Sequence, residues 1–195
     1  MSSADRAGRP FHLCVFCASS GDVDPAFLRL ARDLGERIGR SGMTLVYGGG
    51  NAGLMGELAR ATHENGGRVI GVIPHAVHQK AAKPGFPHEL VVTGDMRERK
   101  KIMEEKADAF LALPGGFGTL EEFFETVTLK QLGYHSKPVV LLDAEGYYGA
   151  LLGFLDEVVE KRFAKAKHLA NFRVARSAEE ALELIGSASR RPGPR

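Results

Sequence analysis

Tryptophan is absent from this sequence of 195 residues, cysteine occurs only twice, and no apolar run is long. None approaches the roughly 20 apolar residues that a membrane-spanning helix needs, and the first ten residues lack the apolar segment of a secretory signal peptide. A strong charge of one sign is also missing, because 26 basic residues face 24 acidic ones. Without a large positive field, binding to nucleic acid is not expected. The sequence therefore predicts a cytoplasmic protein that contacts neither membrane nor nucleic acid.

Cys14 and Cys17 are spaced as C-x-x-C, which could indicate a redox pair or part of a zinc site. Both belong to the apolar segment 12–17, which is typical of a strand, and strand residues three apart face opposite sides. A reactive C-x-x-C normally opens a helix. His75 and His78 have the spacing of metal ligands only in a helix, with no cysteine or carboxylate close by. We therefore predict no disulfide, no redox centre and no bound metal.

Apolar strand-like segments alternate with amphipathic helical segments from residue 11 to residue 186. Continuous apolar strands that alternate with helices are typical of a parallel sheet covered on both faces. The sequence therefore predicts one α/β domain, a doubly wound parallel sheet of about seven strands with helices on both faces. We expect strands at 12–17, 43–47, 68–73, 89–93, 109–113, 137–142 and 171–174, and helices at 25–38, 54–65, 96–107, 119–132, 147–163 and 178–186. We expect residues 1–10 and the basic segment 187–195 to be disordered tails, and 75–87 to be a loop over the site.

The junction after strand 109–113 carries the most informative motif, Pro114-Gly-Gly-Phe-Gly-Thr-Leu-Glu-Glu122. Three of its residues are glycines within four positions, namely Gly115, Gly116 and Gly118. Without Cβ atoms, the backbone N–H groups of this turn can approach a ligand closely. We expect Thr119 to cap the helix that follows, and the unpaired N–H groups and dipole of a helix start favour a phosphate. The motif therefore predicts a phosphate-binding turn.

Two carboxylates, Glu121 and Glu122, follow in the first turn of this predicted helix. A turn that only binds phosphate does not need them, so they indicate chemistry on the molecule that carries the phosphate. An alternative stays open: Thr119-x-x-Glu122 is also a capping box, in which Glu122 satisfies a helix N–H and does nothing else. The flanking Pro114 and the glycine cluster favour a ligand site, since an ordinary turn from strand to helix needs only one glycine.

Two other turns are expected beside this one. The first strand leads into Ser19 and Ser20, and strand 43–47 leads into the glycine turn 48–56, which includes Gly49. The carboxyl ends of parallel strands meet at one edge of a sheet, and ligands gather there. Each turn alone could be a plain tight turn, because a lone glycine cluster is weak evidence. Their shared edge favours one ligand site built from all three.

The predicted helix 96–107 begins at the same edge. Asp95 is a good N-cap, and Glu98 is its capping-box partner. Four residues share one face of this helix at spacings of three and four, namely Met96, Arg99, Lys100 and Met103. A solvated basic patch is the alternative, but two cations between two methionines are unusual on a purely exposed face. We expect the first turn of this helix to reach the ligand site.

Together these motifs resemble the LOG ("lonely guy") family of cytokinin riboside 5′-monophosphate phosphoribohydrolases. The resemblance rests on Pro114-Gly-Gly-x-Gly-Thr-x-x-Glu122, the Arg99-Lys100 pair, the turn 48–56 and Cys17-x-Ser-Ser, and it covers residues 12–186. It implies a homodimer with a Rossmann-like fold and no cofactor. The implied reaction is hydrolysis of the N-glycosidic bond of a purine nucleoside 5′-monophosphate, AMP or N6-isopentenyl-AMP, to free base and ribose 5-phosphate. Such sequences are also labelled lysine decarboxylase-like, but no Schiff-base lysine with a supporting constellation is evident.

The same resemblance implies which residues act. Arg99 and Glu122 match the catalytic pair. The residues implied to bind substrate are Ser19, Ser20, Gly49, Met96, Lys100, Gly115, Gly116, Gly118, Thr119, Glu121 and Thr128. Two positions depart from the family pattern, because Arg97 replaces a histidine and Ala81 replaces a glutamate that contacts the substrate in many members. These departures leave the reaction class unchanged and bear on which base is preferred.

The chemistry of the pair supports a division of roles. A carboxylate near C1′ can stabilise oxocarbenium character and orient or deprotonate water, which we assign to Glu122, with Glu121 turned outward or capping. A guanidinium scarcely loses its proton, so Arg99 is expected to hold phosphate or ribose and to position Glu122. A bound phosphate raises the pKa of Glu122 and Arg99 lowers it, which leaves the net sign open. The alternative function is a non-catalytic nucleotide-binding or carrier protein on the same fold.

Overall fold

The computed structural model describes residues 9–78 and 88–189, in which seven strands form one parallel sheet. The strands are β1 (His12–Phe16), β2 (Thr44–Tyr47), β3 (Arg68–Pro74), β4 (Glu89–Thr93), β5 (Ala109–Ala112), β6 (Val139–Leu142) and β7 (Arg173–Ala175). Their order is β4-β3-β2-β1-β5-β6-β7, and every neighbouring pair is parallel. The predicted α/β fold, a Rossmann-like doubly wound sheet, is therefore confirmed.

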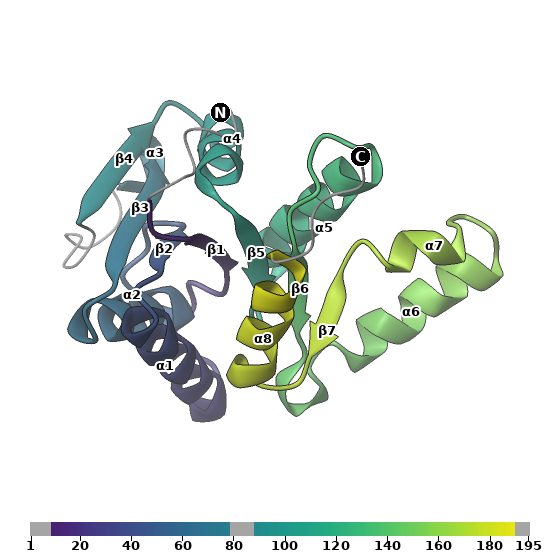
Figure 1. Ribbon diagram of the computed structural model, residues 1–195, viewed down its shortest axis with the longest axis horizontal. Coiled ribbons are helices and arrows are strands. Elements are labelled where there is room, and N and C mark those ends of the chain that lie inside the picture. The colour runs from purple at the N-terminus through teal and green to yellow at the C-terminus, as the bar shows by residue number, and fades with distance from the viewer. Residues whose placement is uncertain (1–8, 79–87, 190–195) are drawn as a thin grey trace.

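Helices alternate with these strands along the chain (Figure 1). They are α1 (Pro25–Arg40), α2 (Gly53–Glu64), α3 (His75–His78), α4 (Met96–Lys106), α5 (Phe117–Gln131), the 3₁₀ turn η2 (Ala144–Gly146), α6 (Gly149–Glu160), α7 (Ala166–Leu169) and α8 (Ala178–Ser189). The expected helix 147–163 is shorter than predicted. The turn η2 comes first, and α6 then runs only from Gly149 to Glu160. The single-turn helix α7 was not predicted, and α8 continues three residues past Gly186. Residues 187–189, expected in a disordered tail, belong to α8, and residues 75–78, expected in a loop, form α3, so these two predictions are wrong there. The rest of the loop 75–87 and residues 1–8 and 190–195 of the expected tails lie outside the described residues.

Each face of the sheet buries its own apolar core. Leu13 and Val15 of β1 pack with residues of α1, α2 and α8, whereas Cys14 and Phe16 pack on the other face with residues of α4 and α5. Figure 1 shows α1, α2 and α8 gathered on one side of the strands and α4 and α5 on the other. Cys17 belongs to the first core and Cys14 to the second, and both thiols are free and buried. The prediction that these cysteines face opposite sides is confirmed.

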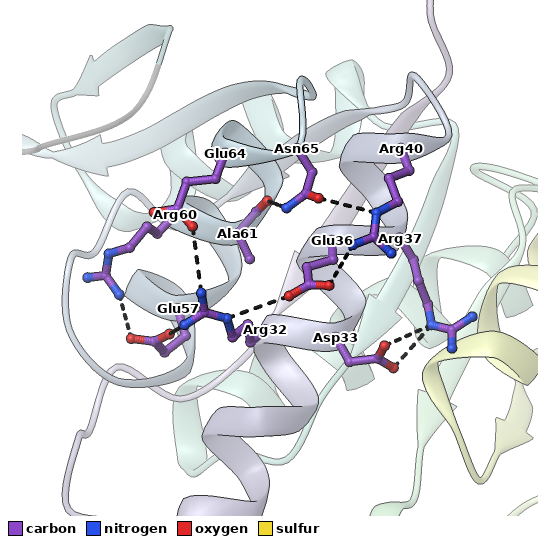
Figure 2. Close-up of polar contacts among 10 residues, drawn as sticks. All are labelled: Arg32, Asp33, Glu36, Arg37, Arg40, Glu57, Arg60, Ala61, Glu64 and Asn65. Carbon is purple, nitrogen blue, oxygen red and sulfur yellow. Dashed lines mark hydrogen bonds and ion pairs between the residues drawn. The ribbon is translucent and has the colours of Figure 1, made fainter.

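Helices α1 and α2 pack closely because two glycines of α1 face α2. A side chain at Gly35 would begin 2.6 Å from the carbonyl oxygen of Leu58, and one at Gly39 would begin 2.7 Å from that of Thr62. Across the outer rim of this helix pair, the guanidinium of Arg32 lies within 4.0 Å of acidic residues from both helices, as Figure 2 shows: Glu36, Glu57 and Glu64. Ion pairs this exposed contribute little to stability, so close backbone packing holds the helix pair together.

No helix within residues 9–78 and 88–189 is long and apolar enough to cross a membrane.

Candidate active site

The strand order places a switch point of the sheet between β1 and β5. From β1 the chain winds outward to β2, β3 and β4, and from β5 it winds in the opposite direction to β6 and β7. In open α/β sheets, ligands bind beside the carboxyl ends of the strands at such a point. Ser19 and Ser20 follow β1 there, and Pro114, Gly115 and Gly116 follow β5. The serine turn after β1 and the glycine turn after β5 thus lie next to each other.

The glycine turn after β2 lies against the turn after β1 and against α4. The amide of Met55 donates to the carbonyl of Ala18 at 3.2 Å, and a side chain at Gly53 would collide with the carbonyl of Ser20. Gly53 also has a φ of +57°, which favours glycine. A side chain at Gly48 would collide with the guanidinium of Arg99. The structure therefore brings the three turns and the α4 helix to one edge.

Helix α5 begins earlier than the sequence predicts. Its first residue is Phe117 and its N-cap is Gly116, which offers no side-chain cap. The prediction that Thr119 caps this helix is wrong, because Thr119 already lies in the first turn, where its side chain fills the space that a side chain on Gly115 would need. The capping-box alternative is wrong for the same reason. Glu122 lies in the second turn, and its carboxylate bonds to a different helix.

The start of α5 is open to ligands. The first N–H groups of a helix have no partner within the helix, and no side chain caps them here. A side chain added at Gly116 or at Gly118 would meet no atom within 4 Å. Phe117 between them is 93% exposed. The backbone of residues 116–118 therefore presents donors and the positive end of the helix dipole to an accessible space, which suits an anion.

Arg99 and Glu122 form a buried ion pair beside this helix start. Arg99 Nη1 donates to Glu122 Oε1 at 2.6 Å, and both residues are 5% exposed. Arg99 Nε donates to the carbonyl of Val72 at 3.0 Å, which ties α4 to the end of β3. Burial raises the pKa of the Glu122 carboxyl, and this effect outweighs the neighbouring Arg99, which lowers it. The direction of the Glu122 pKa shift, which the sequence alone leaves open, is therefore upward.

Lys100 points to the acidic face of α5. Its ammonium bonds to Glu121 and lies 3.0 Å from Glu125 Oε2. Burial lowers the pKa of Lys100, but the hydrogen bonds to these two carboxylates outweigh it and raise that pKa above its usual value. Glu121 is exposed and turned outward, as predicted. Sequence reasoning missed Glu125, although its position one helical turn after Glu121 is a signal that could have indicated it.

The remaining predicted site residues are unevenly placed. Ser19, Ser20 and Met96 are exposed at the carboxyl edge of the sheet. Gly49 is buried with a φ of +74°, and a side chain on it would begin 2.9 Å from Ile73 Cβ, so its turn requires glycine. Thr128 is exposed on α5, nearly two turns beyond Glu122. The structure thus brings Arg99 and Lys100 of α4 together with Glu121 and Glu122 of α5, and Gly49 lies beside Val72, whose carbonyl Arg99 binds.

A pocket of about 280 Å³ borders the glycine turn after β5. Ser20, Gly115 and Gly116 line it, and two aromatic rings, Phe27 and Tyr147, complete its wall. These rings meet edge to face, with centroids 5.5 Å apart. Sequence reasoning missed both aromatic residues. The adjacent pair of tyrosines after the sixth strand is a signal for Tyr147, whereas Phe27 is indistinguishable in sequence from a core residue of α1.

The paired histidines fall on helix α3, a single turn from His75 to His78. In the described part of the chain, no group of three histidine, cysteine, aspartate or glutamate side chains could hold a metal ion.

Comparison with known proteins adds independent findings. A family model described as "Possible lysine decarboxylase" matches residues 55–185. Cytokinin riboside 5′-monophosphate phosphoribohydrolase LOG5 of Arabidopsis thaliana is 42% identical over 173 residues, which cover 89% of this chain and 76% of that protein. Cytokinin riboside 5′-monophosphate phosphoribohydrolase LOG4 of the same plant is 46% identical over 151 residues, which cover 77% of this chain and 70% of that protein.

Among solved structures, the molybdenum cofactor binding protein from the phototrophic bacterium Rippkaea orientalis is similar, with a TM-score of 0.71 and 25% identity. The match covers 93% of this chain and 98% of that one. The molybdenum cofactor carrier protein of Chlamydomonas reinhardtii gives a TM-score of 0.70 at 24% identity, with 92% and 98% covered. These neighbours share the parallel α/β fold described above.

Proposed function

Because the chain belongs to the LOG family of cytokinin riboside 5′-monophosphate phosphoribohydrolases, we propose that it hydrolyses the N-glycosidic bond of purine nucleoside 5′-monophosphates. The products are the free base and ribose 5-phosphate. The observation that carries this proposal is the buried Arg99–Glu122 pair beside the open start of α5. The backbone donors of residues 116–118 and the carboxylate of Glu122 thus lie within two turns of one helix.

The phosphate is proposed to bind at the start of α5. The amides of residues 116–118 and the helix dipole favour a dianion there, and the absence of side chains at Gly116 and Gly118 lets it come close. Ser19 and Ser20 lie across the switch point and can donate hydroxyl hydrogen bonds to the same group. Binding at this point directs the sugar toward the ion pair between Arg99 of α4 and Glu122 of α5.

Glu122 is proposed as the catalytic carboxylate. As the C1′–N9 bond breaks, its electron pair leaves with the base and positive charge develops on the ribose, which a carboxylate stabilises. Glu122 also orients the water that adds to C1′ and accepts its proton, and the departing base takes up a proton, so one water is consumed per base released. Burial raises the pKa of Glu122 and makes it a better base than an exposed glutamate.

Arg99 is proposed to hold Glu122 and the substrate rather than to donate a proton. A guanidinium group is a poor general acid, because it holds its proton too firmly. The bonds to Glu122 and to the carbonyl of Val72 fix its position, and Nη2 remains beside the turn at Gly48. From there it can contact a ribose hydroxyl or phosphate oxygen.

The description of the matching family model as a lysine decarboxylase finds no support in the site. A Schiff base forms on a deprotonated amine, whereas the carboxylates of Glu121 and Glu125 raise the pKa of Lys100 and keep it charged. The chain is therefore proposed to work without a cofactor or metal.

The direct test is to incubate the protein with AMP and with N6-isopentenyl-AMP and to separate the products by chromatography. Release of adenine or isopentenyladenine together with ribose 5-phosphate supports the proposal, and the ratio of kcat/KM values identifies the preferred base. Nucleotide binding without base release would instead support the alternative of a non-catalytic nucleotide-binding or carrier protein.

The protein is further proposed to be a homodimer, as the family resemblance implies. Helix α6 supports this, because its sequence GALLGFLDEVVE is largely apolar, yet none of its residues is buried. Figure 1 shows α6 and α7 at the end of the molecule beyond β7. A helix face this apolar normally packs against another surface. A cytoplasmic location remains an expectation from the sequence.

A further inference from the structure

Two consecutive tyrosines after β6 donate hydrogen bonds to backbone carbonyls of the glycine turn after β5. Tyr147 Oη donates to the carbonyl of Gly115 at 2.9 Å, and Tyr148 Oη donates to the carbonyl of Leu113 at 2.7 Å. These two carbonyls flank Pro114, which has no N–H of its own to anchor the chain. The segment 143–148 therefore fixes the backbone on both sides of the turn that leads into α5.

The bond from Tyr147 determines where the next amide points. The described peptide bonds are trans, so the carbonyl of Gly115 and the N–H of Gly116 point in opposite directions from one rigid plane. Because the carbonyl is held against Tyr147, which lines the wall of the 280 Å³ pocket, the N–H of Gly116 points away from that wall. It therefore faces the opposite side of the turn.

A side-chain hydrogen bond from Tyr147 holds the carbonyl of this peptide plane. Glycine has the widest choice of backbone angles, so neither Gly115 nor Gly116 restricts this peptide plane through a side chain of its own. The packing of Thr119 against Gly115 and the bond from the Leu120 amide to the Gly116 carbonyl at 3.0 Å hold the two ends of the pair. No side chain caps Gly116, and a side chain on it would meet nothing within 4 Å. The hydrogen bond from Tyr147 therefore adds a restraint on the direction of the Gly115 carbonyl.

Tyr147 is itself held in place. Its ring meets the ring of Phe27 edge to face, with centroids 5.5 Å apart, and meets that of Tyr148 in the same way at 4.8 Å. The amide of Tyr148 donates to Asp143 Oδ1 at 2.7 Å, which fixes the backbone that carries both tyrosines. The hydroxyl of Tyr147 is thus positioned before any ligand binds, which is what lowers the cost of ordering a binding loop.

We propose that Tyr147 is a positioning residue for the 5′-phosphate: its hydroxyl fixes the Gly115–Gly116 peptide so that the Gly116 N–H points at the phosphate. This inference rests on the proposed function for the identity of the ligand. The residue does not touch the reacting atoms, and it acts on binding of the phosphate rather than on cleavage of the glycosidic bond.

The test is Tyr147→Phe, which removes the hydroxyl and keeps the ring. We expect the KM for AMP and the inhibition constant of inorganic phosphate to rise together by about five- to tenfold, the range of one lost hydrogen bond, with kcat within about twofold. Hydrolysis of adenosine, which has no phosphate, should change little. The thermal midpoint should also stay close to that of the wild type, because the aromatic contacts remain.

Tyr134→Phe is the matched control, because it makes the same change at an exposed tyrosine. It should leave the KM for AMP and the phosphate inhibition constant unchanged. Unchanged constants in Tyr147→Phe would overturn the proposal, and so would an equal loss on AMP and on adenosine, which would mean a structural role. If the wild type released no base, the proposed function would fail on its own. Calorimetric titration with AMP would then still compare the affinities of the wild type and Tyr147→Phe for the nucleotide.

Discussion

Burial and a counter-charge act in opposite directions on Glu122. The carboxylate is taken out of water, which disfavours its charge, while Arg99 at 2.6 Å favours it. Removing one member of a buried pair leaves the other without a partner and costs stability, so a variant must be judged by both activity and folding.

Glu122→Gln keeps the size of the side chain and a hydrogen-bond acceptor for Arg99. Because the amide neither carries negative charge nor accepts a proton, we expect kcat for base release to fall by about 10²-fold or more. Binding of AMP should stay within a few-fold of the wild type, measured by calorimetry. Glu105→Gln, which makes the same change at an exposed glutamate of α4 outside the predicted site, is the control. Full activity in Glu122→Gln would remove this carboxylate from the reaction.

The pH dependence follows from the raised pKa of Glu122. The proposed mechanism needs the carboxylate, so kcat/KM should fall as the pH falls through the pKa of this residue, and the midpoint should lie above that of an ordinary glutamate. Arg99 lowers that pKa, so Arg99→Ala should move the acid limb of its residual activity to higher pH. Rate profiles of both proteins test this. An acid limb at the same or lower pH in the variant would contradict it.

At the scale of the element, the α1–α2 pair depends on the missing side chains of Gly35 and Gly39. In Gly35→Ala the new methyl group would begin 2.6 Å from the carbonyl oxygen of Leu58, so the helices must separate. We expect a loss of about 1–3 kcal/mol in the free energy of unfolding, measured with urea. Gly186→Ala in α8 is the control, because a methyl group there meets nothing within 4 Å, and it should stabilise by about 0.5–1 kcal/mol.

The main elements of the fold could be predicted from the sequence because their signals are local. The seven strands are continuous apolar segments, and Asp95 caps α4 through bonds of 2.8 Å to the amides of Arg97 and Glu98, as expected. The start of α5 could not be predicted correctly. Thr119 is a good cap in isolation, but the two glycines before it let the helix begin at Phe117. Short elements such as α7 carry no periodic signal at all.

The candidate site was predictable to the extent that its residues lie in motifs. The sequence placed Arg99 and Glu122 in one site, but their burial and the direction of the pKa shift depend on how α4 and α5 pack. The contact of Tyr147 with Gly115 joins residues 32 positions apart, and only the tertiary structure brings them together.

At the scale of the whole molecule, helix α6 is the feature that a single chain leaves unexplained. Phe154 on this helix is 58% exposed. If α6 packs against a second copy, Phe154→Asp places a charge in an apolar contact and should shift the sedimenting species from dimer to monomer. Arg29→Asp, which alters charge on exposed α1, should leave the mass unchanged. A dimer that persists in Phe154→Asp would show that α6 does not form the contact.

Cys14 in β1 and Cys17 directly after it can be used to follow how the two layers of helices separate from the sheet. Cys14 and Cys17 lie on opposite faces of the central strand, and burial raises the pKa of each thiol. An alkylating reagent reacts with the thiolate, so neither sulfur can be labelled until its layer of helices has moved away. The two labelling rates, followed site by site in mass spectra, would therefore report whether the layers of this protein detach together or one at a time.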